Sequence, residues 1–210
     1  MKKTRRIAAM IAAMALAATM VAPTMMNASA NNNNTITITN FDNATHTYEA
    51  YQIFSATYNS DGSLTAINWG DGINSSTLLT NLIAANTANG NPLNGLFTGI
   101  TSSSTAQDVA DCLGAKTTSG DTETAVFVDD SDKAQAFAAI VGESLSSTKS
   151  GTASGNTISG LPDGYYLVQD SAAPSSGTDG NSGAKTRYII DVVGNTTVSV
   201  NAKQAISKVS

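Results

Sequence analysis

The sequence predicts a mainly β protein, α+β by content, in which an antiparallel sandwich carries short helices inserted in one long connection. Two observations predict this fold class. Residues 35–69 and 155–201 contain runs in which apolar and polar residues alternate between turn signals, a pattern typical of half-buried strands. Residues 75–145 show apolar residues at helical spacing instead, which is typical of helices laid over a sheet.

The opening strands are the clearest elements. In "TITITN" the alternation places Ile36 and Ile38 on one face, and a second strand fits Tyr48 to Tyr58. An Asp61-Gly62 turn then leads to "LTAINW", which predicts a hairpin. A short closing strand is expected in "GNTIS", and after a Pro-Asp-Gly turn a second strand is expected from Tyr165 to Asp170. Residues 186–203 are expected to form two more strands, joined at Gly194-Asn195.

Three short helices are expected between the two groups of strands. The first follows a serine cap in "SSTLLTNLIAAN", the second lies in "STAQDVADCLGA" before Gly114, and the third begins at Ser131. Each helix has an apolar stripe that we expect to face the sheet. The stripes are Leu78, Leu79, Leu82 and Ile83; Val109, Cys112 and Leu113; and Ala134, Phe137, Ile140, Val141 and Leu145.

The first thirty residues have the three parts of a removable signal peptide. A basic start precedes the apolar residues 7–21, and Ala28-Ser29-Ala30 predicts cleavage after Ala30. A single membrane anchor is the alternative, but the apolar run is short for a span of about 20 residues. We therefore expect a secreted protein whose only membrane contact is residues 1–30 before cleavage.

About 180 residues remain after cleavage, which is enough for one domain with a real core. Residues 31–34 form a polar asparagine run, which we interpret as a leader, and the domain is expected over residues 35–203. The chain holds 11 basic and 16 acidic residues. Without a basic patch to neutralise phosphates, it is not expected to bind nucleic acid.

Residues that could carry catalytic or metal chemistry are scarce. Cys112 is the only cysteine, which excludes an intrachain disulfide and a cysteine zinc cluster, and its place in a helical stripe favours a buried apolar role. His46 is the only histidine. The acidic residues within 129–132 lack the ligand spacing of a calcium loop, and they lie where a helix N-terminus favours negative charge. We predict no metal, no cofactor and no enzymatic activity.

Three stretches together resemble one protein family. In order along the chain, "TYEAYQIF", "GLPDGYYLVQDSAAP" and "VSVNAK" are similar to the N-terminal domain of a Gram-positive, sortase-assembled major pilin, the backbone subunit of a pilus (fimbria). The resemblance covers about residues 35–208. It implies an Ig-like sandwich of the collagen-adhesin B type and a place in a pilus at the cell surface or cell wall. It also implies other pilin subunits and a pilin-class sortase as partners.

The resemblance implies a role for the closing strand. The family's pilin motif, commonly Val-x-Val-Tyr-Pro-Lys, contains a lysine whose amine attacks the thioester between sortase and the threonine of another subunit. Here Val198, Val200, Asn201, Ala202 and Lys203 are similar to it, with a departure at the Tyr-Pro pair. Strand alternation independently turns Asn201 and Lys203 outward. An ordinary solvated strand-end lysine is the alternative interpretation.

The family also uses intramolecular Lys-Asn isopeptide bonds catalysed by a buried acid. The resemblance places Asp170 at the position of that acid and Asn201 at the position of the Asn. However, Thr39 and Asn40 stand where the first-strand lysine is expected, and alternation turns Asn201 away from the core. We therefore predict no isopeptide bond in this domain, with Asp170 as a vestigial acid that serves as a turn or sheet-edge polar residue.

The last residues resemble the start of another pilin domain. "AISKVS" is similar to a first strand, in which Lys208 would begin that domain's own isopeptide bond. Residues 204–210 would then be a linker and the start of a next domain, whether through a truncated product or a partial gene model. A second hypothesis is a cell-surface adhesin domain that binds a host glycan or matrix protein through the helices and residues 173–185. In that case Lys203 has no role.

Overall fold

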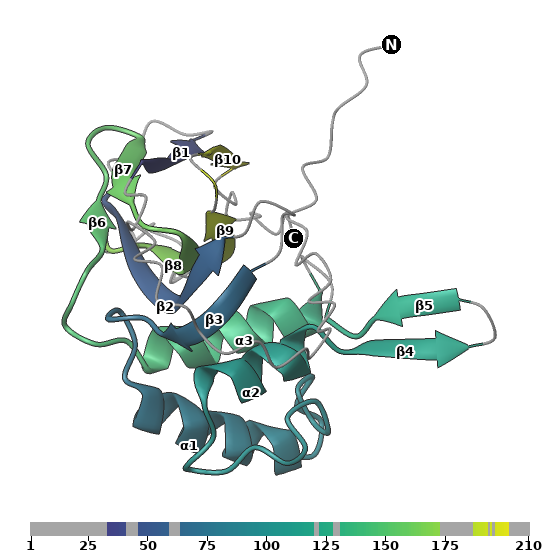
Figure 1. Ribbon diagram of the computed structural model, residues 1–210. Coiled ribbons are helices and arrows are strands. Elements are labelled where there is room, and N and C mark those ends of the chain that lie inside the picture. Colours follow the sequence, from purple (N-terminus) through teal and green to yellow (C-terminus); the bar gives the residue numbers. More distant parts are fainter. Residues whose placement is uncertain are drawn as a thin grey trace, which may run out of the picture.

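The computed structural model describes residues 33–40, 46–58, 64–119, 122–127, 131–172, 187–192, 194 and 196–201. In these residues a three-stranded sheet packs on a five-stranded sheet, and helices cover the other face of the larger sheet (Figure 1). The mainly β architecture with inserted helices is therefore confirmed. The helices all lie between β3 (Leu64–Trp69) and β6 (Gly151–Thr152), in one long connection as predicted.

The two sheets are mainly antiparallel. In the small sheet the strand order is β10, β1, β7, and in the large sheet it is β3, β2, β8, β9, with β6 also paired to β2. Among the described strands of these sheets, only β1 and β10 run parallel. The alternation of apolar and polar residues can be the same in parallel and antiparallel strands, so the sequence could not predict this exception. The bounds are β1 Asn34–Thr39, β2 Tyr48–Tyr58, β7 Thr157–Leu161, β8 Gly164–Asp170, β9 Arg187–Val192 and β10 Thr197–Asn201.

A first apolar core fills the space between the two sheets. Every second residue of β1 is buried there, as the alternation of Ile36 and Ile38 predicts. The aromatic rings of Tyr48 and Tyr166 are the largest side chains of this core. The other buried members are Ala50, Ile158, Leu161, Val168, Ile190 and Val192.

A second, larger core lies between the large sheet and the helices. The buried Phe137 contacts two other rings there, with its ring centroid 6.0 Å from that of Phe97 and 5.8 Å from that of Phe127. The pairing of β2 with β8 shifts register between Gln52 and Phe54, so the neighbours Ile53 and Phe54 both enter this core. Both faces of β8 are buried because one contacts the helix-side core and the other contacts the core between the sheets, which explains its nearly continuous apolar sequence.

Each helix begins at a capping side chain. Asn74 caps α1 (Ser75–Thr87), Thr105 caps α2 (Ala106–Leu113), and Ser131 caps α3 (Asp132–Glu143). The predicted start at Ser131 is confirmed, but the serine cap expected for the first helix is wrong. The side-chain oxygen of Asn74 accepts a hydrogen bond from the backbone N–H of Thr77 at 3.2 Å. An amide oxygen satisfies a free helix N–H as a serine hydroxyl does.

Three strands were not predicted from the sequence: the short β6, and the two strands of a polar hairpin. The hairpin of β4 (Lys116–Ser119) and β5 (Thr122–Ala125) forms a separate two-stranded sheet, which projects from the helical layer (Figure 1). Its sequence, "KTTSGDTETA", has no apolar alternation. A hairpin that is polar on both faces leaves no periodic signal, because such a signal comes from burying one face.

We predict that Gly164 cannot be replaced even by alanine without a large loss of stability. Its φ is +156°, and an added Cβ would lie 2.3 Å from the carbonyl oxygen of Phe54. Gly155 also has positive φ, +62°, but an added Cβ would meet no atom within 4 Å. We expect Gly155→Ala to lower the free energy of unfolding by about 1 kcal/mol and Gly164→Ala by about 3 kcal/mol or more in urea titrations. Equal losses in the two variants would contradict the close contact.

Candidate functional site

The closing strand β10 pairs with β1 along its whole length, from Thr35 opposite Thr197 to Thr39 opposite Asn201. Val198 and Val200 are half-buried and pack against the core between the sheets, whereas Ser199 and Asn201 are exposed. The strand therefore follows the predicted alternation as far as Asn201. The remaining predicted site residues, Ala30, Ala202, Lys203 and Lys208, lie outside the described residues, and their roles stay predictions.

A buried amide fixes the place where β10 begins. Asn34 is fully buried, so the polar leader predicted over residues 31–34 ends before it. Its side-chain nitrogen donates to the carbonyl oxygen of Leu161 at 3.1 Å and to a carboxylate oxygen of Asp163 at 2.9 Å. Its side-chain oxygen accepts from the backbone N–H of Thr196 at 2.9 Å. The same Asp163 oxygen accepts from the backbone N–H of Gly194 at 2.8 Å.

These groups, called here the Asn34 network, connect three parts of the chain. They join β1, the turn between β7 and β8, and the segment between β9 and β10. Both N–H donors and the oxygen of the Asn34 amide have partners, as a buried amide requires. The predicted Pro-Asp-Gly turn thus supplies the carboxylate that holds the start of the closing strand.

A second group of polar contacts supports the Asn34 network. The side-chain nitrogen of Gln52 donates to the backbone oxygen of Asp163 and to the hydroxyl of Tyr166, both at 3.2 Å. The Tyr166 hydroxyl donates to the carbonyl oxygen of Pro162 at 2.8 Å. Burial, together with the nearby charge of Asp163, raises the pKa of Tyr166 above its ordinary value. Tyr166 is therefore a neutral donor at physiological pH.

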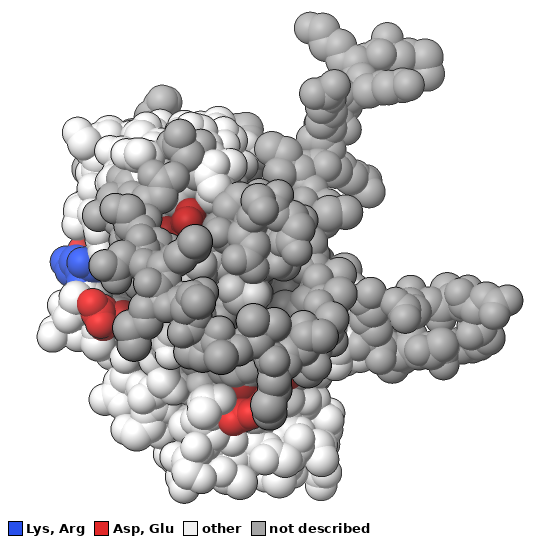
Figure 2. All heavy atoms as spheres, in the orientation of Figure 1, with Lys and Arg blue, Asp and Glu red and all other residues white. Residues whose placement is uncertain are grey.

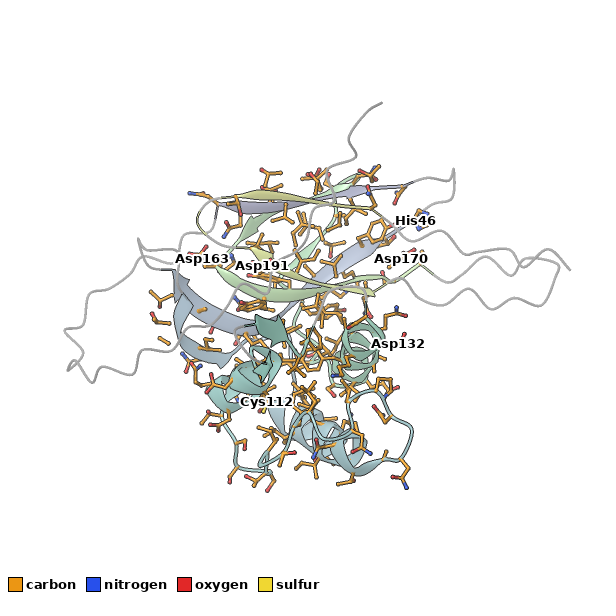
Figure 3. The ribbon with its side chains drawn as sticks, turned by 90° about the vertical axis from the view of Figure 1, so that its right-hand side faces the viewer. His46, Cys112, Asp132, Asp163, Asp170 and Asp191 are labelled. Atoms are coloured by element: carbon orange, nitrogen blue, oxygen red, sulfur yellow. The ribbon has the colours of Figure 1, made fainter. Side chains whose placement is uncertain are left out.

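Asp170 lies at the opposite end of β8 from Asp163, beside His46 (Figure 3). One carboxylate oxygen is 2.6 Å from Nδ1 of His46. The other accepts from the backbone N–H of Thr47 at 3.1 Å and of Ala172 at 3.0 Å. Asp170 thus closes a turn at the end of β8, which is an interior strand of the large sheet and not an edge strand. Its partners among the described residues do not include a lysine. The sequence could not indicate the His46 pairing, because 124 positions separate the two residues.

A buried glutamate forms a second charged cluster on β2. Glu49 is 7% exposed, and its carboxylate accepts from Nζ of Lys149 at 2.5 Å and from the Tyr51 hydroxyl at 2.8 Å. Burial acts to raise the pKa of Glu49, but the hydrogen bonds from Lys149 and Tyr51 outweigh it, so the pKa lies below its ordinary value. The hydrogen bond to Glu49 and the charge of Glu49 raise the pKa of Lys149.

Three further groups, Cys112, Tyr165 and Asp191, have surroundings that favour the protonated form. Cys112 is half-buried against the helix-side core, and burial with the charges of Asp111 and Asp108 raises the pKa of its thiol. The protonated thiol is a poor nucleophile. Asp191 lies opposite Tyr165 on the large sheet, and burial raises the pKa of both groups, that of Tyr165 to about 12.

Within the described residues, no three His, Cys, Asp or Glu side chains gather as metal ligands. In the same part of the chain, no helix has the length and apolar content needed to span a membrane. Searches with models of known protein families and against curated proteins find no match to the chain. No relative identifies functional residues, so the candidate site rests on the contacts within this chain. It consists of β10, its partner β1 and the Asn34 network.

We predict that the Glu49 cluster makes stability depend on acidic pH. Because the pKa of Glu49 is lowered in the folded protein, its stabilisation is present above the ordinary glutamate value of about 4.3 and is lost as pH falls through the folded pKa. Wild type should therefore have a higher free energy of unfolding than Glu49→Gln. The difference between the two should be constant from neutral pH to about 5 and should shrink below about 4.

The matched control is Glu143→Gln, because Glu143 is exposed at the end of α3. The free energies of unfolding of wild type, Glu49→Gln and Glu143→Gln are compared by denaturant titrations across this pH range. A difference between wild type and Glu49→Gln that grew as the pH fell would show that the buried carboxylate destabilises the fold, contrary to this account.

Proposed function

We propose that this chain is a structural subunit of a covalently polymerised bacterial surface pilus. In this proposal Lys203 supplies the amine to which a pilin-class sortase joins another subunit. The observation that supports it is the way β10 is held: it pairs with β1 from end to end and starts at the Asn34 network. An acceptor amine on such a strand has a fixed position, which favours its reaction with a large enzyme-bound partner.

We infer that the strand alternation of β10, which the structure describes as far as Asn201, continues to Lys203. Ser199 and Asn201 are exposed on the outer face of β10, and Lys203 follows at the same spacing of two. In the reaction, the lysine nitrogen attacks the thioester carbonyl that joins sortase to a threonine. An amide bond forms, the sortase thiolate leaves, and the sortase site takes up the proton that the amine must lose.

We infer further that the sandwich is of the Ig-like, collagen-adhesin B type. Two packed sheets with the first and last strands side by side support this inference. In a shaft built through Lys203, tension would pass from that lysine into the residues after it and largely bypass the sandwich. Such a domain needs no covalent cross-link. The contacts of Asp170 with His46 and Thr47, and the exposure of Asn201, agree with a domain that forms no isopeptide bond.

One observation favours the second candidate, an adhesin that binds a host glycan. Residues 72–107 contain no Lys, Arg, Asp, Glu or His, and their exposed side chains are mostly Asn, Ser and Thr. We call this segment, which includes α1, the uncharged pole. It lies at the lower end of the molecule, where the surface shows few charged side chains (Figures 1 and 2). Amide and hydroxyl groups without competing charges suit a neutral sugar.

The pilus proposal predicts one specific branch point. The mature chain should be mixed with a pilin-class sortase and an LPxTG peptide, and the products analysed by intact mass and peptide mapping. We expect a peptide joined to Lys203 in wild type and in Lys149→Ala, and no adduct in Lys203→Ala. Lys149 is the matched control because Glu49 holds its amine in a hydrogen bond, and its raised pKa favours the unreactive ammonium form.

Two outcomes would contradict parts of this account. No adduct, or an adduct spread over several lysines, would leave Lys203 an ordinary surface lysine and favour the adhesin. A mass lower by one ammonia before sortase is added would overturn the prediction that this domain forms no isopeptide bond.

A further inference from the structure

We propose that Asn89, in the Asn89-Gly90 pair that follows α1, is a site of spontaneous deamidation, and that the nearby Asn94-Gly95 pair is protected by the fold. The two pairs lie in the same loop of the uncharged pole. This inference is independent of the pilus proposal, because it concerns the chemistry of the loop alone.

The reaction needs only water and a free backbone. The backbone nitrogen of the glycine attacks the side-chain carbonyl carbon of the asparagine, and a carbon–nitrogen bond forms. The bond from that carbon to the amide nitrogen breaks, and ammonia leaves with the proton of the attacking N–H. Water then opens the five-membered ring at either carbonyl, which leaves aspartate or isoaspartate. Glycine favours ring closure because no side chain hinders the attacking nitrogen.

The Asn89-Gly90 pair is free to react. Both residues are exposed, and within the described residues neither the Asn89 side chain nor the Gly90 backbone N–H forms a hydrogen bond. A Cβ placed on Gly90 would meet no atom within 4 Å, so the space around the attacking nitrogen is open. No hydrogen bond of the attacking or the leaving nitrogen has to break before the ring closes.

The Asn94-Gly95 pair is equally exposed but differs in its hydrogen bonds. Gly95 has the same φ as Gly90, +77°, and the same open space. However, its backbone N–H donates to the carbonyl oxygen of Asn86 at 3.1 Å, and the side-chain nitrogen of Asn94 donates to the carbonyl oxygen of Ala88 at 3.1 Å. Both the attacking and the leaving nitrogen are held, and ring closure requires both bonds to break.

Deamidation at Asn89 would change the uncharged pole in a defined way. It places a carboxylate in a segment that has no charged residue, immediately after Ala88, the C-terminal cap of α1. Negative charge at a helix C-terminus is unfavourable, because the helix dipole is negative there. A contact that depends on an uncharged surface would therefore weaken as the protein ages.

The test is to incubate the mature chain at neutral to mildly alkaline pH and follow chymotryptic peptides by tandem mass spectrometry. We expect a gain of about one mass unit at Asn89 that proceeds at least about fivefold faster than at Asn94, since two hydrogen bonds must break at the latter site. Asn89→Ser should remove most of the mass gain of this loop, and Asn94→Ser should leave it unchanged.

The same incubation in concentrated urea distinguishes an effect of the fold on the two deamidation rates from an effect of the local sequence. The two rates should become similar there, because both sites are the same Asn-Gly dipeptide. Equal rates in the folded protein, or faster reaction at Asn94, would overturn the proposal. A preference for Asn89 that persisted unchanged in urea would also overturn it, since the hydrogen bonds of the fold would then not be the cause.

Discussion

The buried amide of Asn34 is the interaction on which the position of the closing strand depends. It is fully buried, and each of its hydrogen-bonding atoms has a partner in a different part of the chain from β1. Loss of this side chain would remove a donor from the carbonyl of the buried Leu161, and a buried polar group that loses its partner is costly. The N–H of Thr196 would lose the acceptor that ties the start of β10 to β1. The hydrogen bonds therefore select one arrangement, with β10 beside β1.

The rest of the fold follows from burying both faces of the large sheet. One face packs on the small sheet, which carries β10, and the other packs on the helices, which carry the uncharged pole (Figure 1). The candidate acceptor strand and the candidate binding surface are thus separated by the central sheet. Substitutions on one surface are expected to leave the other unchanged, so the two candidate functions can be tested independently.

Local patterns in the sequence predicted the elements well, because those patterns report burial of one face. The alternation of Ile36 and Ile38, the strand from Tyr48 to Tyr58 and the helix start at Ser131 are examples. Contacts between distant residues left no such pattern. Asn34 is one of four consecutive asparagines, and only its partners in the folded chain distinguish it from a solvated leader residue. The His46–Asp170 and Glu49–Lys149 pairs were missed for the same reason.

Hydrogen exchange of the β10 amides in Asn34→Ala tests the central claim, that the Asn34 network holds the closing strand in place. Asn68→Ala is the control, because Asn68 is exposed and its side chain bonds only to the carbonyl of Ala66 among the described residues. We expect the amides of β10 to exchange at least about tenfold faster in Asn34→Ala, with the amides of α3 little changed. Unchanged protection of β10, or an equal loss in β10 and α3, would contradict the claim.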